Sequence, residues 1–398
     1  MDITIQPRAL RGEITIIPSK SQAHRLLICA AFANNETTLV CPDTNRDIEA
    51  TVDCLNALGA DIRRTDTGYD VSPVSEVPET AVLNCCESGS TLRFMLPIAG
   101  ALGVDTVFTM EGRLPQRPLS PLWEEMERMG CRLSRPTSDT IRCSGKLKPG
   151  EYSIDGSVSS QYITGLLFAL SLMDRPSKLK ITGSVESKPY IELTKAAMRK
   201  FHVDPDHLGM QTYHTPGSLK VEGDWSNGAF WLGAKALGSS LTVKGLNPHS
   251  AQGDKVSDGI LRILSTSAGA PIMNVADIPD LVPIISVVAA AYNGVVLQNI
   301  QRLRLKESDR VATVIEMIED LGGTAEATED TLRIYGTGLT GGTVDSHNDH
   351  RISMAAAIAA TFCKEPVTIL GAECVKKSYP RFWEEYVRLG GQYEQHIR

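Results

Sequence analysis

The chain has 398 residues, of which 42% are hydrophobic and 22% are charged, and its net charge is −7. A chain this long exceeds what one hydrophobic core usually serves, so two domains are expected. The acidic balance disfavours a general nucleic-acid or membrane-surface binder. No segment approaches the roughly 20 apolar residues of a membrane span, and Met1–Ile5 lacks the basic and apolar regions of a signal peptide.

Nine cysteines are scattered along the chain, and an odd number without an export signal is typical of reduced cytosolic thiols. Only Cys85 and Cys86 are adjacent, and this spacing, with no histidine set beside it, does not resemble a metal site. The sequence therefore predicts a cytoplasmic protein with no metal ion.

Short strand-like runs alternate with helical runs from the N-terminus onward. A strand over 14–17 ends at Pro18, and strands are also predicted over 38–40 and 106–109. This alternation predicts an α/β or α+β fold. Helices are predicted over 25–33, 47–58, 161–172, 191–200, 229–237, 281–291, 311–321 and 352–361.

Six polar clusters open apolar runs at intervals of roughly 55 to 70 residues, which indicates one supersecondary unit used repeatedly. Hydroxyl and acidic side chains cap helix N-termini, and a helix N-terminus favours anions. Six units fit two domains of three, with the simplest boundary near Gly223. The clusters are Ser19–Ser21, Ser88–Thr91, Ser157–Ser160, Asp224–Ser226, Asp277–Asp280 and Asn348–His350.

Several of these clusters, and segments near them, carry cations or neutral polar groups that suit an anionic ligand. Lys20, Ser21 and Arg25 would form a phosphate or carboxylate cradle, and the alternative is a capped helix with solvated charges. Gly89 permits close approach of a ligand to the backbone, although an ordinary turn explains it equally. Other candidates are Arg113 and Arg117 between prolines, Ser159–Gln161, Ser187–Tyr190, Arg351 at the start of a nearly uncharged helix, and Lys376–Lys377.

Two acids are candidates for proton transfer. Asp280 precedes an apolar helix, and the alternative is an N-cap acid for that helix. Glu307 lies between Lys306 and Arg310, which we expect on one face of a helix at spacing i, i+4. Neighbouring cations would tune the proton affinity of Glu307, and the alternative is a salt-bridged surface.

One glycine motif is discounted. Residues 336–341 match GxGxxG, but a turn and a strand-like run follow in place of the helix that a dinucleotide site requires. No phosphate-binding loop of the GxxxxGK[ST] type is present.

Taken in order, these motifs resemble the 5-enolpyruvylshikimate-3-phosphate synthase (3-phosphoshikimate 1-carboxyvinyltransferase) family over 14–380. The segments that carry the resemblance are Pro18–Arg25, Glu87–Phe94, Ser157–Gln161, Ser187–Tyr190, Asp277–Asp280, Leu305–Arg310, Asp349–Arg351 and Lys377–Pro380.

The resemblance implies two similar lobes, each of three βαβαββ units, in an inside-out α/β barrel of the enolpyruvyl transferase type. One lobe would be discontinuous, formed by residues 1–17 and 224–398, and the other would comprise 18–223. The active site would lie between them. The resemblance also implies a monomer that needs no cofactor and no metal and has no nucleic-acid or membrane partner.

The implied reaction transfers the enolpyruvyl group of phosphoenolpyruvate to the 5-hydroxyl of shikimate 3-phosphate through a tetrahedral intermediate, on the route to chorismate and aromatic amino acids. Asp280 would be the base at the hydroxyl, and Glu307, with Lys20, would exchange protons with the methylene carbon. Shikimate 3-phosphate would contact Lys20, Ser21, Arg25, Ser159, Ser160, Gln161, Ser187, Tyr190, Asp280 and Lys306. Phosphoenolpyruvate would contact Lys20, Gly89, Arg117, Gln161, Arg310, Arg351 and Lys377.

Two residues depart from the pattern of some relatives: Glu87 replaces Asn and Phe94 replaces Pro, which could weaken anion binding and shift the helix. Two other functions are considered. An enolpyruvyl transferase for UDP-N-acetylglucosamine usually carries a cysteine in the loop corresponding to 112–118, and this loop has none. A non-catalytic anion-binding protein would not need Asp280 and Glu307 beside the cations.

Overall fold

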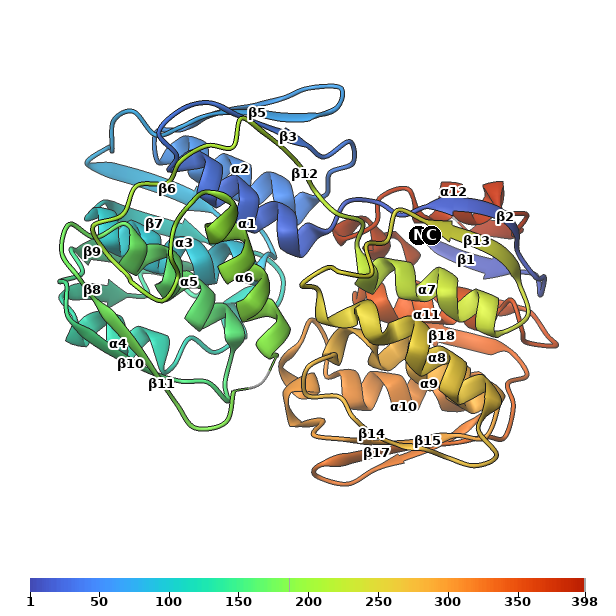
Figure 1. Cartoon of the computed structure of the whole chain (residues 1–398). Coiled ribbons are helices and arrows are strands. Elements are labelled where there is room, and N and C mark those ends of the chain that lie inside the picture. Colours follow the sequence, from blue (N-terminus) through green and yellow to red (C-terminus); the bar gives the residue numbers. More distant parts are fainter. Residues whose placement is uncertain (186, 397–398) are drawn as a thin grey trace. The chain divides into compact units, whose positions relative to one another are not determined.

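The chain forms two compact units in the computed structural model, which describes residues 1–185 and 187–396 (Figure 1). Pro18–Glu222 make up the central unit, and Met1–Ile17 together with Gly223–Arg398 make up the terminal unit. The predicted division differs by one residue, because Gly223 belongs to the terminal unit. Each unit has its own hydrophobic core. Among the described residues, no helix is both long and apolar enough to cross a membrane.

The central unit alternates buried helices with short sheets. Its helices are α1 (Lys20–Ala31), α2 (Arg46–Ala57), α3 (Gly89–Leu102), the 3-10 turn η1 (Leu114–Gln116), α4 (Leu122–Arg128), α5 (Ser160–Ser171) and α6 (Lys188–Lys200). Its strands are β3 (Thr37–Val40), β4 (Asp61–Arg64), β5 (Gly68–Ser72), β6 (Thr80–Asn84), β7 (Asp105–Thr109), β8 (Cys131–Ser134), β9 (Thr140–Gly145), β10 (Glu151–Asp155), β11 (Lys178–Thr182) and β12 (Ser218–Lys220).

The terminal unit follows the same scheme. Its strands are β1 (Asp2–Ile5), β2 (Arg11–Thr15), β13 (Ser240–Lys244), β14 (Ile272–Asn274), β15 (Val295–Gln298), β16 (Thr324–Ala327), β17 (Thr331–Tyr335), β18 (Gly342–Asp345), β19 (Val367–Leu370) and β20 (Tyr393–His396). Its helices are α7 (Trp225–Ala236), α8 (Ser257–Thr266), α9 (Val282–Ala291), α10 (Arg310–Asp320), α11 (His350–Ala359) and α12 (Phe382–Arg388). The 3-10 turns are η2 (Gly253–Val256), η3 (Pro279–Leu281), η4 (Gln301–Leu305) and η5 (Ala372–Lys377).

Four of the six sheets share one topology, in which a parallel pair is followed by two antiparallel strands. In the central unit the orders are β6-β7-β9-β8 and β12-β3-β5-β4, and in the terminal unit they are β14-β15-β17-β16 and β18-β19-β1-β20. The remaining sheets, β10-β11 and β13-β2, are parallel pairs. The internal repeat predicted from the spacing of polar clusters thus corresponds to a four-stranded sheet topology that occurs four times among the described residues.

The first strands of the chain complete sheets of the terminal unit. β1 pairs with β19 and β20, and β2 pairs with β13, so that β1 and β2 lie among segments from the C-terminal half (Figure 1). Because β1 and β2 belong to the terminal unit, the chain passes from one unit to the other twice, after Ile17 and after Glu222.

The predicted helices are all present, and polar first turns extend most of them toward the N-terminus, whereas α9 begins one residue later than predicted. α1 begins at Lys20 where the apolar pattern predicted residue 25, and α7 begins at Trp225 where it predicted residue 229. These first turns lack apolar periodicity, so the caps mark the starts better than the pattern does. Ser19, Ser88 and Ser159 accept backbone hydrogen bonds as N-caps in the central unit.

The discounted glycine motif forms a connection between strands. It runs from the end of β17 to the start of β18, and β18 pairs in parallel with β19. No helix follows the motif directly, so the reason for discounting a dinucleotide site is confirmed.

Candidate active site

A chain of hydroxyl groups joins the starts of α1, α2 and α3 in the central unit. The Ser88 Oγ lies 2.7 Å from the Thr91 Oγ1, which lies 2.8 Å from the Thr51 Oγ1. Thr51 in turn lies 2.7 Å from the Nδ1 of His24. Burial, followed by the charges of two neighbouring cations, lowers the pKa of His24 well below its usual value. A neutral histidine and three buried hydroxyls therefore fix these helix starts without adding charge. The sequence interpretation missed this role of His24, Thr51 and Thr91.

Lys20 has an acidic partner that the sequence interpretation also missed. Its Nζ lies 2.7 Å from the Oδ2 of Asp47, and both side chains are largely buried. Asp47 is in the first turn of α2, and nothing in its local sequence separates it from an ordinary helix-start acid. The pair holds the Lys20 ammonium at the start of α1.

Arg25 is buried among neutral groups. Its Nε donates to the Thr194 Oγ1 at 2.8 Å, and its terminal nitrogens donate to the carbonyls of Ser21 at 2.6 Å and Tyr190 at 3.1 Å. Among the described residues no carboxylate pairs with it, and burial lowers the pKa of Arg25 to about 10. The alternative in which the charge of Arg25 is solvated is therefore wrong. A buried cation without an acidic partner is what an anion site requires.

Phe94 supports Arg25 and does not interrupt the helix. The guanidinium carbon lies 5.1 Å from the centre of the Phe94 ring, which is within the range of a cation–π interaction. α3 runs without a break from Gly89 to Leu102. A continuous helix therefore accommodates Phe94, and a shift relative to relatives with proline stays a prediction.

Gly89 leaves room for two arginines. A Cβ atom at this position would lie 2.5 Å from an NH1 nitrogen of both Arg117 and Arg93. Arg93 donates to the carbonyl of Pro118 at 3.0 Å, and the Tyr162 hydroxyl donates to the same carbonyl at 2.5 Å. These two bonds anchor the residue that follows Arg117. The guanidinium of Arg117 therefore lies against Gly89, and the sequence interpretation missed the supporting role of Arg93.

The start of α5 meets the start of α3. Ser159 caps α5 by accepting from the Gln161 backbone, and the Gln161 Nε2 donates to the Ser90 Oγ at 3.0 Å. Ser160 is buried in the first turn. Ser187 precedes α6 with φ of 54°, in the left-handed region, and its side chain is buried. Three of the predicted positions, Lys20, Gly89 and Gln161, thus belong to helix starts that this network links.

In the terminal unit, Arg310 is the centre of an ion-pair cluster. Its guanidinium is fully buried and contacts Asp280 at 2.7 Å, Glu307 at 2.8 Å and Asp349 at 2.8 Å. Asp349 also caps α11 by accepting from the backbone of Arg351. A single arginine therefore joins η3, α10, α11 and the segment before α10.

Asp280 is not the N-cap of α9. Its carboxylate lies 2.7 Å from Arg310, 2.9 Å from Arg351 and 3.8 Å from Lys306, and α9 has no side-chain cap. The helix-cap alternative for this residue is therefore wrong. Arg351, followed by Lys306 and Arg310, outweighs burial and holds the pKa of Asp280 well below its usual value.

Lys306 and Arg310 do not share a helix face, contrary to the prediction. α10 begins at Arg310 with Asp309 as its N-cap, and Lys306 directly follows the preceding 3-10 turn η4 as its C-cap. The two cations meet at Asp280 instead, because the turn between them directs both toward η3. Burial lowers the pKa of Lys306 to about 8, although Asp280 opposes the change.

Lys377 lies at the end of η5, and its Nζ donates to the carbonyl of Asn348 at 2.9 Å. Asn348 directly precedes the cap residue of α11, so Lys377 and Arg351 belong to neighbouring parts of the terminal unit. The predicted residues of this unit are therefore gathered around the starts of α9, α10 and α11.

The fold is similar to that of two solved structures. EPSP synthase from Acinetobacter baumannii superposes with a TM-score of 0.81 at 22% identity, covering 99% of this chain and all of the other. The enolpyruvyl transferase NikO from Streptomyces tendae superposes with a TM-score of 0.76 at 16% identity, over 100% and 99% of the two chains.

A family model and sequence relatives show the family of the chain. The model of EPSP synthase (3-phosphoshikimate 1-carboxyvinyltransferase) matches residues 5–386. The 3-phosphoshikimate 1-carboxyvinyltransferase of Clostridium kluyveri is 37% identical over 99% of this chain and 98% of its own, and that of Clostridium acetobutylicum is 38% identical over 98% and 97%. The chain belongs to the EPSP synthase family. It is thus a transferase of the shikimate pathway for aromatic amino acid biosynthesis.

Proposed function

We propose that this chain transfers the enolpyruvyl group of phosphoenolpyruvate to the 5-hydroxyl of shikimate 3-phosphate and releases inorganic phosphate through a tetrahedral intermediate. The observation that carries the proposal is the cluster around Arg310, where two candidate proton-transfer acids share one arginine. An anion-binding protein without a reaction has no need for two such acids at its cations. The family of the chain supports the same reaction.

The central unit supplies most of the proposed contacts with shikimate 3-phosphate. Arg25, which has no carboxylate partner among the described residues, would pair with an anionic group. The hydroxyls and amide at the start of α5 would bind uncharged oxygens. The proposed set is Lys20, Ser21, Arg25, Ser159, Ser160, Gln161, Ser187 and Tyr190, with Asp280 and Lys306 from the terminal unit.

Phosphoenolpyruvate would bind to arginines of both units. Arg117 and the backbone at Gly89 would contribute from the central unit, and Arg310 and Arg351 from the terminal unit. Lys20, Gln161 and Lys377 complete the proposed set. Bidentate arginine contacts suit carboxylate and phosphate groups, and each helix N-terminus would contribute about 0.3–1 kcal/mol per anionic group.

Asp280 is the proposed base at the 5-hydroxyl. Two arginines depress its pKa, and a carboxylate held in this way is a weak base. An anionic substrate that binds Arg310 and Arg351 would take part of their charge away from Asp280. The pKa of Asp280 would then rise toward the range in which a general base is effective. Substrate binding would therefore activate the base.

Glu307 is the proposed acid that protonates the methylene carbon and later removes a proton from the methyl group. Its carboxylate contacts Arg310 and is partly exposed, in contrast to the fully buried Asp349 on the same arginine. Of these two acids, Glu307 is the one that a bound substrate can reach. Lys20 is proposed to assist this proton exchange.

The experiment is an assay of phosphate release from phosphoenolpyruvate with each acceptor in turn. We expect release with shikimate 3-phosphate and none with UDP-N-acetylglucosamine. Phosphate release with UDP-N-acetylglucosamine but not with shikimate 3-phosphate would show that the proposed acceptor is wrong. Calorimetric binding of phosphoenolpyruvate and shikimate 3-phosphate without any phosphate release would favour an anion-binding protein instead.

A further inference from the structure

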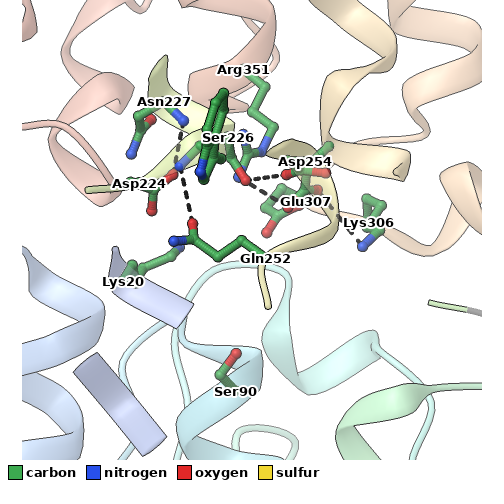
Figure 2. Close-up of polar contacts among 12 residues, drawn as sticks. Lys20, Ser90, Asp224, Ser226, Asn227, Gln252, Asp254, Lys306, Glu307 and Arg351 are labelled. Atoms are coloured by element: carbon green, nitrogen blue, oxygen red, sulfur yellow. Dashed lines mark hydrogen bonds and ion pairs between the residues drawn. The ribbon is translucent and has the colours of Figure 1, made fainter. Parts of the chain in front are cut away.

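Asp254, in η2, is a buried carboxyl group that the proposed reaction does not use. The residue is 3% exposed, and its Oδ2 contacts the hydroxyl of Ser226 at the start of α7. Its other oxygen, Oδ1, is buried and accepts no hydrogen bond from any described residue. Figure 2 shows the Ser226 hydroxyl directed at the Asp254 carboxyl group. A carboxylate left in this condition pays a large desolvation penalty.

The cations near Asp254 are already paired with other acids. Arg310 contacts Asp280, Glu307 and Asp349, and Arg351 and Lys306 also contact Asp280. Arg351 acts on Asp254 only as a weaker, opposing charge. The ion pairs of this cluster join three acids to three cations, and within the described part of the chain Asp254 forms no ion pair.

The charged groups on the elements packed against Asp254 do not change this balance. Asp224, the N-cap of α7, repels a negative charge on Asp254, as does Asp280. Lys255, the next residue in η2, directs its Nζ to the carbonyl of Ser250 at 2.7 Å. Asp258 in α8 is exposed and lies 3.6 Å from Arg262.

We propose that Asp254 is a positioning residue that keeps its proton and, as a neutral acid bonded to Ser226, lets Asp280 remain the anion that Arg310 and Arg351 hold. Loss of this proton places a second negative charge beside Asp280. The charge weakens the hold of the two arginines on incoming anions. Binding of phosphoenolpyruvate therefore weakens as Asp254 ionises.

The pH range follows from the environment. Burial, and then the charge of Asp280, raises the pKa of Asp254 to about 7. The proposal deepens the proposed function, since it rests on Asp280 acting as the base. Its tests therefore include two measurements that need no turnover.

The first measurement is infrared difference spectroscopy of the wild type against Asp254→Asn, between pH 5 and 9. We expect a carbonyl band of a protonated carboxylic acid that titrates near neutral pH in the wild type and is missing in the variant. If no such band titrates in the wild type, or if the variant keeps it, the proposal is overturned whether or not the chain is an active transferase.

The second measurement is urea unfolding as a function of pH. A carboxyl group whose pKa is raised by folding stabilises the native state below the unfolded pKa, and this contribution is lost as pH rises toward the folded pKa. Asp254→Asn should therefore gain stability relative to the wild type between about pH 4 and pH 7 and stay level above that. A difference that is constant with pH would contradict the proposal.

The third measurement is the pH profile of kcat/KM for phosphoenolpyruvate. Asp254→Asn should lose no more than about fivefold at pH 6 and should lack the inflection near pH 7. A larger loss at pH 6 would show that the anion of Asp254 is the working form, and an unchanged inflection would assign the titration to another group; either result overturns the proposal. The exposed Asp258→Asn is the matched control and should keep the wild-type profile.

Ser226→Ala provides a directional test if Asp254→Asn does not fold. The Ser226 hydroxyl lowers the pKa of Asp254 by bonding to its charged form. Its removal should move the inflection of kcat/KM and the infrared titration to higher pH. Movement to lower pH, or none, would overturn the proposed role.

Discussion

The two units bury charge in opposite ways. In the central unit, Arg25 is buried against hydroxyls, carbonyls and an aromatic ring, with no acid among the described residues. In the terminal unit, Arg310 is buried against three carboxylates. The first arrangement leaves a cation available for an anionic ligand, whereas the second already neutralises itself. Two units with the same sheet topology therefore bury an arginine in different ways, one without an acidic partner among the described residues and one within a cluster of acids.

The largest expected effect is on stability, at Arg310. Arg310→Met would leave the buried carboxylate of Asp349 without its main counter-charge and would remove one of the cations that hold Asp280. We expect a loss of about 3–5 kcal/mol in the free energy of unfolding, measured by urea denaturation. If this variant is as stable as the wild type, the buried carboxylates of the terminal unit do not depend on Arg310, and the proposed difference between the units is wrong.

Arg25→Met is the matched variant in the central unit. Because no acid is left unpaired, the stability should change by less than about 1.5 kcal/mol, mainly through lost hydrogen bonds. Binding of shikimate 3-phosphate, measured by calorimetry, should nevertheless fall by about tenfold or more. A loss of stability as large as that of Arg310→Met would contradict the proposed difference between an arginine buried without acids and one buried among three acids.

Loss of the proposed base or acid should mainly affect turnover. Asp280→Asn or Glu307→Gln should lower kcat by about two or more decades, measured by phosphate release. The exposed Glu329→Gln, in the same unit, should have little effect. Near-normal turnover in Asp280→Asn or Glu307→Gln would exclude that residue from the mechanism.

A smaller effect is expected at Gly89, which sharpens the role of Arg117. Gly89→Ala would push the ends of Arg117 and Arg93 away from α3, because the new Cβ lies 2.5 Å from both. We expect KM for phosphoenolpyruvate to rise about three- to tenfold with a smaller change in kcat. Gly259→Ala in α8, where a Cβ meets nothing within 4 Å, is the control and should leave KM unchanged. An unchanged KM in Gly89→Ala would dissociate Arg117 from this substrate.

The smallest effect concerns Lys306 and pH. The pKa of this lysine is lowered to about 8, so its positive charge is present below pH 8 and is lost as pH rises through that value. The affinity for shikimate 3-phosphate should fall above pH 8 in the wild type. Lys306→Arg should move this decline to higher pH, since arginine stays charged. If the affinity declines over the same pH range in the wild type and in Lys306→Arg, a group other than Lys306 causes the decline.

Local sequence was sufficient to predict the helices, their N-cap residues and the presence of an internal repeat. Ser19, Ser88, Ser159, Asp224 and Asp349 all act as N-caps, as hydroxyl and acidic residues before apolar runs predict. The same pattern failed at Asp280, because a cap and an ion-pair acid have the same local sequence. It also failed at Lys306, where a 3-10 turn replaces the helix that the i, i+4 spacing predicted.

What the sequence determined by itself is the order of polar clusters and the chemistry that each one offers. The tertiary structure decided the partners: Asp47 for Lys20, Arg351 for Asp280 over 71 positions of the chain, and Ser226 for Asp254. These pairings depend on how separate helices pack, and no periodicity or cap signal encodes them. Burial and neighbouring charge then set which carboxyl groups keep their protons, and both are properties of the folded units alone.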